Sequence, residues 1–168
     1  MDINTATQAL ASLTGGTFVG LDTETAVVLK GGKKNLLQGR VTKRVTGSQV
    51  MCFTNNKTNA YDAMVKRRLA AEGKDPDSFV LGPRAWGERM PGTSFVQHKG
   101  AFYLEVIFMH AGKSEYLLDG QPVDVSTIDG MPEAPAATGQ GGLEKQVVIR
   151  TYALDSIVTM RANGQVWQ

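Results

Sequence analysis

The chain has 168 residues, 42% of them hydrophobic, and a formal net charge of +2. A chain of this length can bury a core without disulfide or metal support, so we expect residues 1–168 to form a single domain. No apolar run approaches the roughly 20 residues that span a bilayer, and the amino-terminal stretch MDINTATQAL lacks the basic region of a secretory signal. We therefore expect a cytoplasmic protein without membrane contact.

The first half of the sequence predicts a helix followed by strands. Residues 3–13 place apolar side chains at helical spacing and end at a pair of glycines. GTFVGL and TAVVLK are typical of two strands or one bent strand. Residues 39–55 alternate apolar and polar side chains around Gly47 and Ser48, and we interpret them as a β-hairpin that turns there. Cys52, the only cysteine, lies in the apolar return strand and is expected in the core.

The second half predicts another helix and then a series of strands. Residues 60–73 return to the helical period and end at a glycine. FVQH, AFYLEVIFM, SEYLLDG and QPVDV are strand-like, and turns are expected at Lys99-Gly100 and at Ala111-Gly112. The carboxy-terminal part adds two more strand candidates.

The order of these elements indicates the fold class. Seven or more strands and two helices follow one another without the strand–helix alternation of parallel sheets. This predicts an α+β fold, mostly antiparallel β, for which an OB-like barrel with one or two helices is one architecture. Residues 132–142 are rich in Pro, Ala and Gly and predict a flexible loop.

The stretch FVGLDTET resembles the first motif of DnaQ-like 3′–5′ exonucleases. In that family, Asp22 and Glu24 would share one strand face and hold divalent metals. Asp62 is similar to the second motif, an Asp at a helix start. The final motif, a Tyr or His shortly before an Asp on a helix, has no good match, because Tyr152 and Asp155 lie in a strand-like segment. A metal-dependent exonuclease is therefore an alternative function, and a strand end with solvent-facing acids is the simpler explanation.

Other catalytic patterns are missing from the sequence. His98 and His110 stand in no metal-ligand spacing, and no GxSxG, GxGxxG or GxxxxGK[ST] motif is present. We therefore expect a protein without enzymatic activity, metal or cofactor.

The charge is distributed unevenly along the chain. Residues 30–99 hold fourteen Lys and Arg against five Asp and Glu, a net charge of +9, whereas residues 1–29 carry −3 and residues 100–168 carry −4. A basic middle between acidic ends favours a polyanionic partner. A basic surface balanced by the acidic flanks after folding is the alternative.

Three clusters in this basic middle hold the candidate binding residues. A Trp between two arginines in a Gly/Pro-rich loop suits stacking on unpaired bases, while guanidinium groups bind phosphate. In the alternative, the Trp pins its loop onto the core. The candidates are Lys33, Lys34, Arg40, Lys43 and Arg44 in the predicted hairpin, Lys66 and Arg67 in the predicted helix, and Arg84, Trp86 and Arg89 in the loop.

A small mixed-β domain with a basic hairpin and an aromatic residue in a basic loop resembles phage-type single-stranded DNA-binding proteins. The resemblance implies binding of single-stranded DNA during replication. The chain departs from the pattern in its ending, RANGQVWQ, which lacks the acidic tail through which many such proteins recruit partners.

We therefore predict a nucleic-acid-binding protein that prefers single-stranded DNA, since no helix-turn-helix or zinc finger is visible. RNA remains an alternative ligand. A structural or assembly protein is a further alternative, in which AFYLEVIFM and KQVVIRTYAL form the edge of a homo-oligomer.

Overall fold

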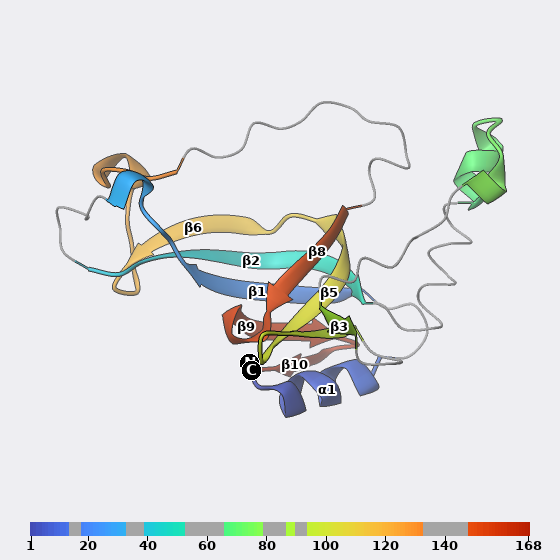
Figure 1. Cartoon of the computed structure of the whole chain (residues 1–168), viewed down its shortest axis with the longest axis horizontal. Helices are drawn as coiled ribbons and strands as arrows, with labels where there is room; N and C mark the ends of the chain where they lie inside the picture. The colour runs from blue at the N-terminus through green and yellow to red at the C-terminus, as the bar shows by residue number, and fades with distance from the viewer. Residues whose placement is uncertain (14–17, 33–38, 53–65, 79–86, 90–93, 133–147) are drawn as a thin grey trace.

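Antiparallel strands are the main regular element of this computed structural model, which describes residues 1–13, 18–32, 39–52, 66–78, 87–89, 94–132 and 148–168. In chain order the strands are β1 (Val19–Ala26), β2 (Val41–Cys52), β3 (Glu88–Arg89), β4 (Phe95–His98), β5 (Ala101–His110), β6 (Lys113–Leu118), β7 (Gln121–Pro122), β8 (Val148–Ala153), β9 (Ile157–Ala162) and β10 (Gln165–Trp167). The described strands form one 10-stranded sheet whose main path runs β10-β9-β1-β2-β5-β4-β3. The sheet curls strongly (Figure 1), and the predicted mostly antiparallel α+β class is confirmed.

The amino-terminal helix α1 (Ile3–Ala11) lies at one end of the curled sheet (Figure 1). The Asp2 carboxylate caps it by accepting hydrogen bonds from the amides of Asn4 and Thr5. Its apolar stripe is buried at Ala6, Ala9 and Leu10. The helix predicted from apolar spacing is therefore confirmed, and it ends two residues earlier than expected.

The hydrophobic core lies on one face of the curled sheet, which we call the inner face. It contains Val19 and Leu21 of β1, Val50 of β2, and Leu104 and Val106 of β5, together with the buried side of α1. Cys52 belongs to the same core, as expected from its apolar run.

The predicted β-hairpin over residues 39–55 is wrong. Val41 to Cys52 form one continuous strand, β2, which pairs with β1 on both sides of Gly47. The strand accommodates Gly47 at φ 78° as an irregularity in the ladder, so the chain keeps its direction. A glycine at positive φ is compatible with either a turn or a bulge. Here the pairing of β2 with β1 on both sides of Gly47 is compatible only with the bulge.

The turn predicted at Ala111-Gly112 is also wrong. Gln49 pairs with His110 of β5 and Thr46 pairs with Lys113 of β6, so β5 and β6 run in one direction along the same edge of β2. At the bend, the amide of Gly112 donates a hydrogen bond to Ser48 Oγ. A Cβ at Gly112 would collide with the Thr46 carbonyl group and lie 2.6 Å from the Ser48 amide nitrogen. The glycine therefore permits close packing of the two bent strands.

Other predictions of local structure agree better. Lys99 and Gly100 turn the chain between β4 and β5, as expected, with φ of 49° and 80°. β1 continues through LDTET but ends at Ala26, so the TAVVLK strand is largely replaced by an irregular stretch and a 3₁₀ turn, η1 (Lys30–Gly32).

The second predicted helix and the predicted loop are described in part. Residues 66–71 are helical and stand apart from the sheet (Figure 1), and Gly73 follows them at φ 71°, the conformation expected of a C-terminal stop. Short 3₁₀ turns complete the described part: η2 (Pro76–Ser78), η3 (Val125–Thr127) and η4 (Leu154–Ser156). Beyond Pro132, the loop predicted over 132–142 lies outside the described residues, and the single-domain prediction stays a prediction. No described helix has both the length and the apolar character needed to span a bilayer.

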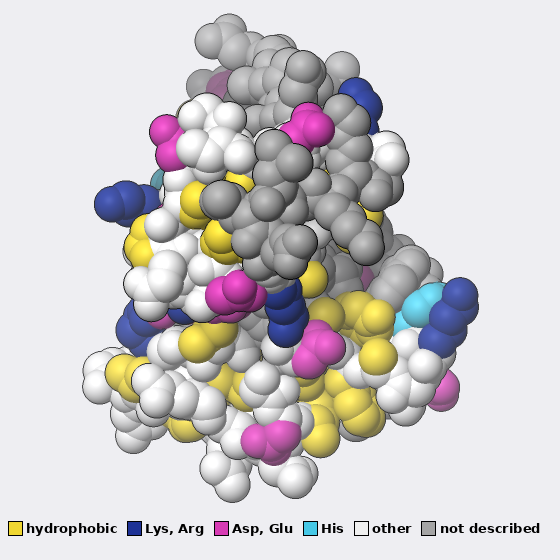
Figure 2. All heavy atoms as spheres, turned by 90° about the vertical axis from the view of Figure 1, so that its left-hand side faces the viewer, with side chains coloured by type: hydrophobic (Ala, Val, Ile, Leu, Met, Phe, Trp, Pro, Cys, Tyr) yellow, Lys and Arg dark blue, Asp and Glu magenta, His cyan; other side chains and the backbone are white. Residues whose placement is uncertain are grey.

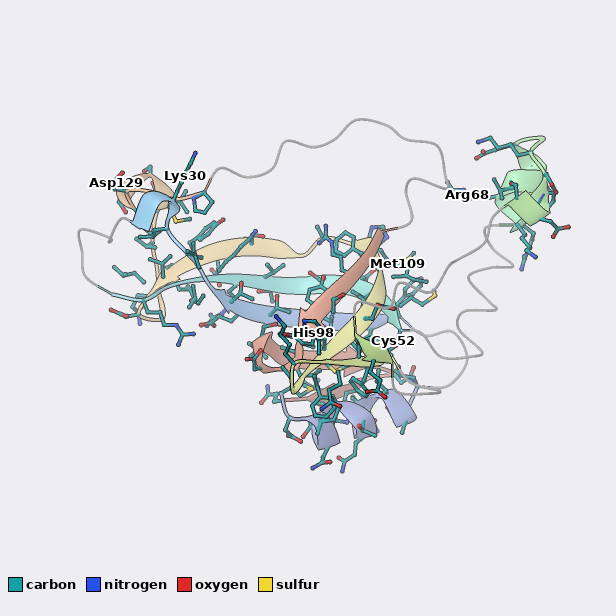
Figure 3. The ribbon with its side chains drawn as sticks, viewed as in Figure 1. Lys30, Cys52, Arg68, His98, Met109 and Asp129 are labelled. Carbon is teal, nitrogen blue, oxygen red and sulfur yellow. The ribbon has the colours of Figure 1, made fainter. Side chains whose placement is uncertain are left out.

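The outer face of the sheet is covered at the end where β2 begins. Leu117 of β6 is fully buried there, and Ile128, just after η3, is 4% exposed. The Lys30 amide donates to the Gly130 carbonyl, which joins η1 to the segment after η3. Figure 3 shows Lys30 and Asp129 together at this end of the molecule.

Candidate nucleic-acid interface

The face on which each side chain lies follows from the strand register, because directly opposite residues of an antiparallel ladder share a face. Along β1, Leu21 is buried on the inner face, and strand alternation puts Thr25 on the same side. Thr25 pairs with Lys43 of β2, which in turn pairs with Tyr116 of β6. Lys43 and Tyr116 therefore lie on the inner face, beyond the hydrophobic core.

Lys43 and Tyr116 form a cation–aromatic pair. The Lys43 Nζ lies 5.9 Å from the centroid of the Tyr116 ring, near the outer limit for attraction between an ammonium group and an aromatic face. Both residues are half-buried, and their neighbours Thr25 and Ser114 are exposed. The pair thus lies on an accessible, polar part of the inner face.

A second cation–aromatic pair lies on the same face. Phe108 of β5 pairs with the core residue Val50, and Arg150 of β8 pairs with the core residue Val106. The Arg150 guanidinium carbon is 3.6 Å from the centroid of the Phe108 ring, a stacking distance. Arg150 is exposed while Phe108 packs against the rim of the core. We call Lys43, Tyr116, Phe108 and Arg150 the cation–aromatic face.

The outer face, by contrast, carries ion pairs. Arg44, which neighbours Lys43 in β2, points to the opposite side of the sheet and donates two hydrogen bonds to Glu24 Oε2, at 3.2 Å from Nε and 3.0 Å from Nη2. Its Nη1 is also 3.7 Å from Glu115 Oε1 on β6. The charge of Arg44 is therefore balanced by two carboxylates, which leaves little of it for a polyanion.

Asp22 occupies the outer face two residues before Glu24. Its carboxylate accepts two hydrogen bonds from the Arg161 guanidinium, at 2.5 and 2.6 Å, and a third from the Gly47 amide at 2.7 Å. Hydrogen bonding to Arg161 lowers the pKa of Asp22, against the opposing effect of burial, and the Gly47 amide lowers it further. The same pair raises the pKa of Arg161. Asp22 is thus held ionised within a structural network.

The two acids of the exonuclease-like motif are both engaged in ion pairs. Asp22 and Glu24 do share one face of β1, as the motif requires, but each carboxylate is bound by an arginine rather than facing another acid. Asp62 lies outside the described residues, and Tyr152 and Asp155 lie in β8 and η4 rather than on a helix. Within the described ranges, no three His, Cys, Asp or Glu side chains gather closely enough to hold a metal ion.

The structure separates the basic residues that the sequence grouped together. Lys43 and Arg44 lie on opposite faces, and the Arg40 side chain is exposed while its amide donates to Asp119. Lys66 pairs with Asp77 at 3.3 Å, and Arg67 is exposed on the helical segment that also carries Arg68 (Figure 3). Arg89 lies in β3, opposite Val96. Lys33, Lys34, Arg84 and Trp86 lie outside the described residues.

Three residues of the cation–aromatic face were not among the sequence-based candidates. Tyr116 was not a candidate because a turn at Gly112 would have kept β6 from pairing with β2. Its position opposite Lys43 depends on the ladder between β2 and β6. Phe108 and Arg150 come from β5 and β8, which are separated along the chain by β6, β7 and η3, so no local spacing could bring them together. Alternation in VIRTYA does indicate that Arg150 and Tyr152 share a face, but not which partner lies beneath Arg150.

The predicted oligomer edge is revised for one of its two segments only, because β8 pairs with β5 alone among the described strands and its role in an oligomer stays a prediction. AFYLEVIFM corresponds to β5, which pairs with β2, β4 and β8, and KQVVIRTYAL contains β8, which pairs with β5. The two segments therefore pair with each other inside one chain, and β5 is an interior strand. Figure 2 shows another face of the molecule, on which described basic and acidic side chains are interspersed rather than gathered into a patch of one sign.

Comparison with protein-family models gave no match. Searches of curated proteins and of solved structures likewise gave no significant match.

Proposed function

We propose that the protein binds single-stranded nucleic acid, preferably single-stranded DNA, on its cation–aromatic face. The observation that carries this proposal is the presence of two cation–aromatic pairs, Lys43 with Tyr116 and Arg150 with Phe108, on one face of the sheet. Unpaired bases stack on aromatic rings and on guanidinium planes, and the cations attract phosphates.

The arrangement of charge supports the same face. On the outer side Arg44 and Arg161 are held by Glu24 and Asp22, so their charges are largely neutralised. Lys43 and Arg150 lie on the inner face, and neither takes part in any of the ion pairs found among the described residues. A nucleic-acid strand would therefore meet a net positive potential on the inner side of this part of the sheet.

An OB-like arrangement is part of this proposal. OB folds are small, partly open antiparallel barrels in which one face of the sheet binds oligonucleotides. The sheet is curled (Figure 1), and Lys43 and Tyr116 lie on its inner side outside the hydrophobic core, which supports a face of this kind. Lys33, Lys34, Arg84 and Trp86 remain candidates from the sequence that would add phosphate and base contacts.

The test is a fluorescence-anisotropy titration with a labelled single strand, its duplex and the equivalent RNA. We expect the single strand to bind most tightly, and its affinity to fall steeply between about 50 and 200 mM salt because phosphate contacts release counterions. Affinity that does not change with salt would contradict the proposal.

A matched pair of variants locates the site. Lys43→Gln should weaken binding and reduce the dependence of log affinity on log salt by about one. Lys113→Gln is the control, because Lys113 is an exposed residue of β6 on the outer face, opposite Thr46. Equal losses in the two variants would show that charge alone, and not the inner face, governs binding.

A further inference from the structure

The two cation–aromatic pairs lie along one line of the sheet. Because β5 and β6 run in the same direction along β2, Phe108 and Tyr116 lie eight positions apart on what is effectively one bent strand. At about 3.3 Å per residue this separation is at most about 26 Å, and the bend at Gly112 shortens it. The two pairs are therefore distinct platforms on a common face.

The surface between these platforms is uncharged. The ladder places Ser114, Val45 and Thr23 on the inner face between the two pairs. Of these, Thr23 is 6% exposed and Val45 is half-buried, so neither projects a large stacking surface. A ligand that contacts one platform must cross this uncharged stretch before it contacts the second platform.

We infer that binding is bipartite: one nucleic-acid strand engages the Lys43–Tyr116 and Arg150–Phe108 platforms together, and a minimum strand length is needed. This inference rests on the proposed function. A stacked strand advances about 3.4 Å per nucleotide, so a span of at most about 26 Å corresponds to roughly eight nucleotides. A shorter strand reaches one platform at a time and loses the gain in effective concentration that a linked second contact provides.

The length dependence tests the inference directly. Deoxyadenosine oligomers of about 4, 8, 12 and 16 nucleotides cover the usual range of site sizes. We expect the affinity to rise by more than about tenfold between the shortest oligomer and the one of about 12 nucleotides, and then to level off. A longer oligomer also offers more positions at which a single site can bind. An affinity that rises only in proportion to this number of positions would overturn the bipartite site.

Variants at each platform separate this result from a single site. Tyr116→Leu should remove the step in affinity, so that long oligomers bind the variant about as weakly as short ones bind the unmodified protein. Arg150→Gln should do the same from the other platform. If either variant instead weakens all lengths by one common factor, a single platform carries the binding and the inference is wrong.

The controls distinguish failure of this inference from failure of the proposed function. Lys113→Gln should retain the step in affinity, and Lys43→Gln provides a second variant at the first platform if Tyr116→Leu unfolds. Binding without a length threshold contradicts the bipartite site alone. No binding at any length contradicts both the proposed function and this inference.

Discussion

Asp22 and Arg161 join β1 to β9 through a bidentate contact in which both carboxylate oxygens accept hydrogen bonds from the guanidinium group. The same carboxylate accepts the amide of Gly47, on the other side of β1. The ladders of β1 with both β2 and β9 shift register beside Asp22. One side chain therefore fixes three strands at the place where their regular pairing is interrupted.

Replacement of Asp22 by Asn should destabilise the fold by about 2 kcal/mol, the usual scale for hydrogen bonds to a charged group. The Asp22 side chain is 14% exposed, so little solvent is available to replace the lost contacts. Glu24→Gln is the matched control on the same strand face, and its more exposed pair with Arg44 should contribute at most about 1 kcal/mol. Urea unfolding measures both, and equal losses would refute the special role of Asp22.

The contribution of Asp22 should also depend on pH. Because Arg161 lowers its pKa in the folded protein, this contribution is complete above the unfolded pKa of about 3.9 and is lost as the pH falls toward the lower, folded value. The difference in unfolding free energy between the unmodified protein and Asp22→Asn should therefore shrink as the pH falls below about 4. A constant difference across that range would mean that the carboxylate charge is not what stabilises the fold.

Gly112→Ala should be strongly destabilising, by about 3 kcal/mol or more, as expected when an added methyl group forces backbone apart. The new Cβ would meet the backbone of Thr46 and Ser48, which cannot move without breaking the bent ladder. Gly120→Ala is the control, since that glycine has φ 83° but open space around it and should cost only about 1–2 kcal/mol of conformational strain. Thermal unfolding of both variants checks the difference.

Arg44 and Lys43 should differ in their effect on nucleic-acid binding although they are adjacent. Arg44 is paired with Glu24 and Glu115 on the outer face, so Arg44→Gln should change the affinity by less than about twofold. Lys43→Gln should weaken binding several-fold, since one lost phosphate contact lowers both the affinity and its salt dependence. If Arg44→Gln proved the more damaging variant, the outer face would be the binding face.

Asp22 and Glu24 should not support nuclease activity, because both carboxylates are engaged by arginines. A labelled oligonucleotide incubated with the protein and Mg²⁺ or Mn²⁺ should stay whole. Cleavage that Asp22→Ala abolishes, but Lys113→Gln does not, would restore the exonuclease interpretation.

Local sequence patterns predicted the elements whose cause is local. The apolar spacing of α1 and the positive-φ pair at Lys99 and Gly100 depend on neighbouring residues alone, and both were found as expected. Gly47 and Gly112 are equally clear local signals, but the turns predicted from them are wrong. A glycine marks a change of backbone direction or a close approach, and only the pairing of β2 with β1, β5 and β6 decides between them.

The candidate interface was less predictable than the fold because it is assembled from distant strands. Basic composition identified both Lys43 and Arg44, but the charge cluster gave no indication that Glu24 and Glu115 neutralise Arg44. The contact between Arg150 and Phe108 depends on how β8 pairs with β5 across the sheet. Such a contact follows from topology, which spacing along one segment does not determine.

Photo-crosslinking tests the central claim most directly. A bromodeoxyuridine-substituted single strand of about 12 nucleotides, within the usual range of site sizes, is bound to the full chain, irradiated and mapped by peptide mass spectrometry. Stacking on the cation–aromatic face predicts crosslinks in the peptides that carry Tyr116 and Phe108, at low salt and not at high salt. Crosslinks that avoid both peptides and fall on the helical residues 66–71 or on the outer face would contradict the account.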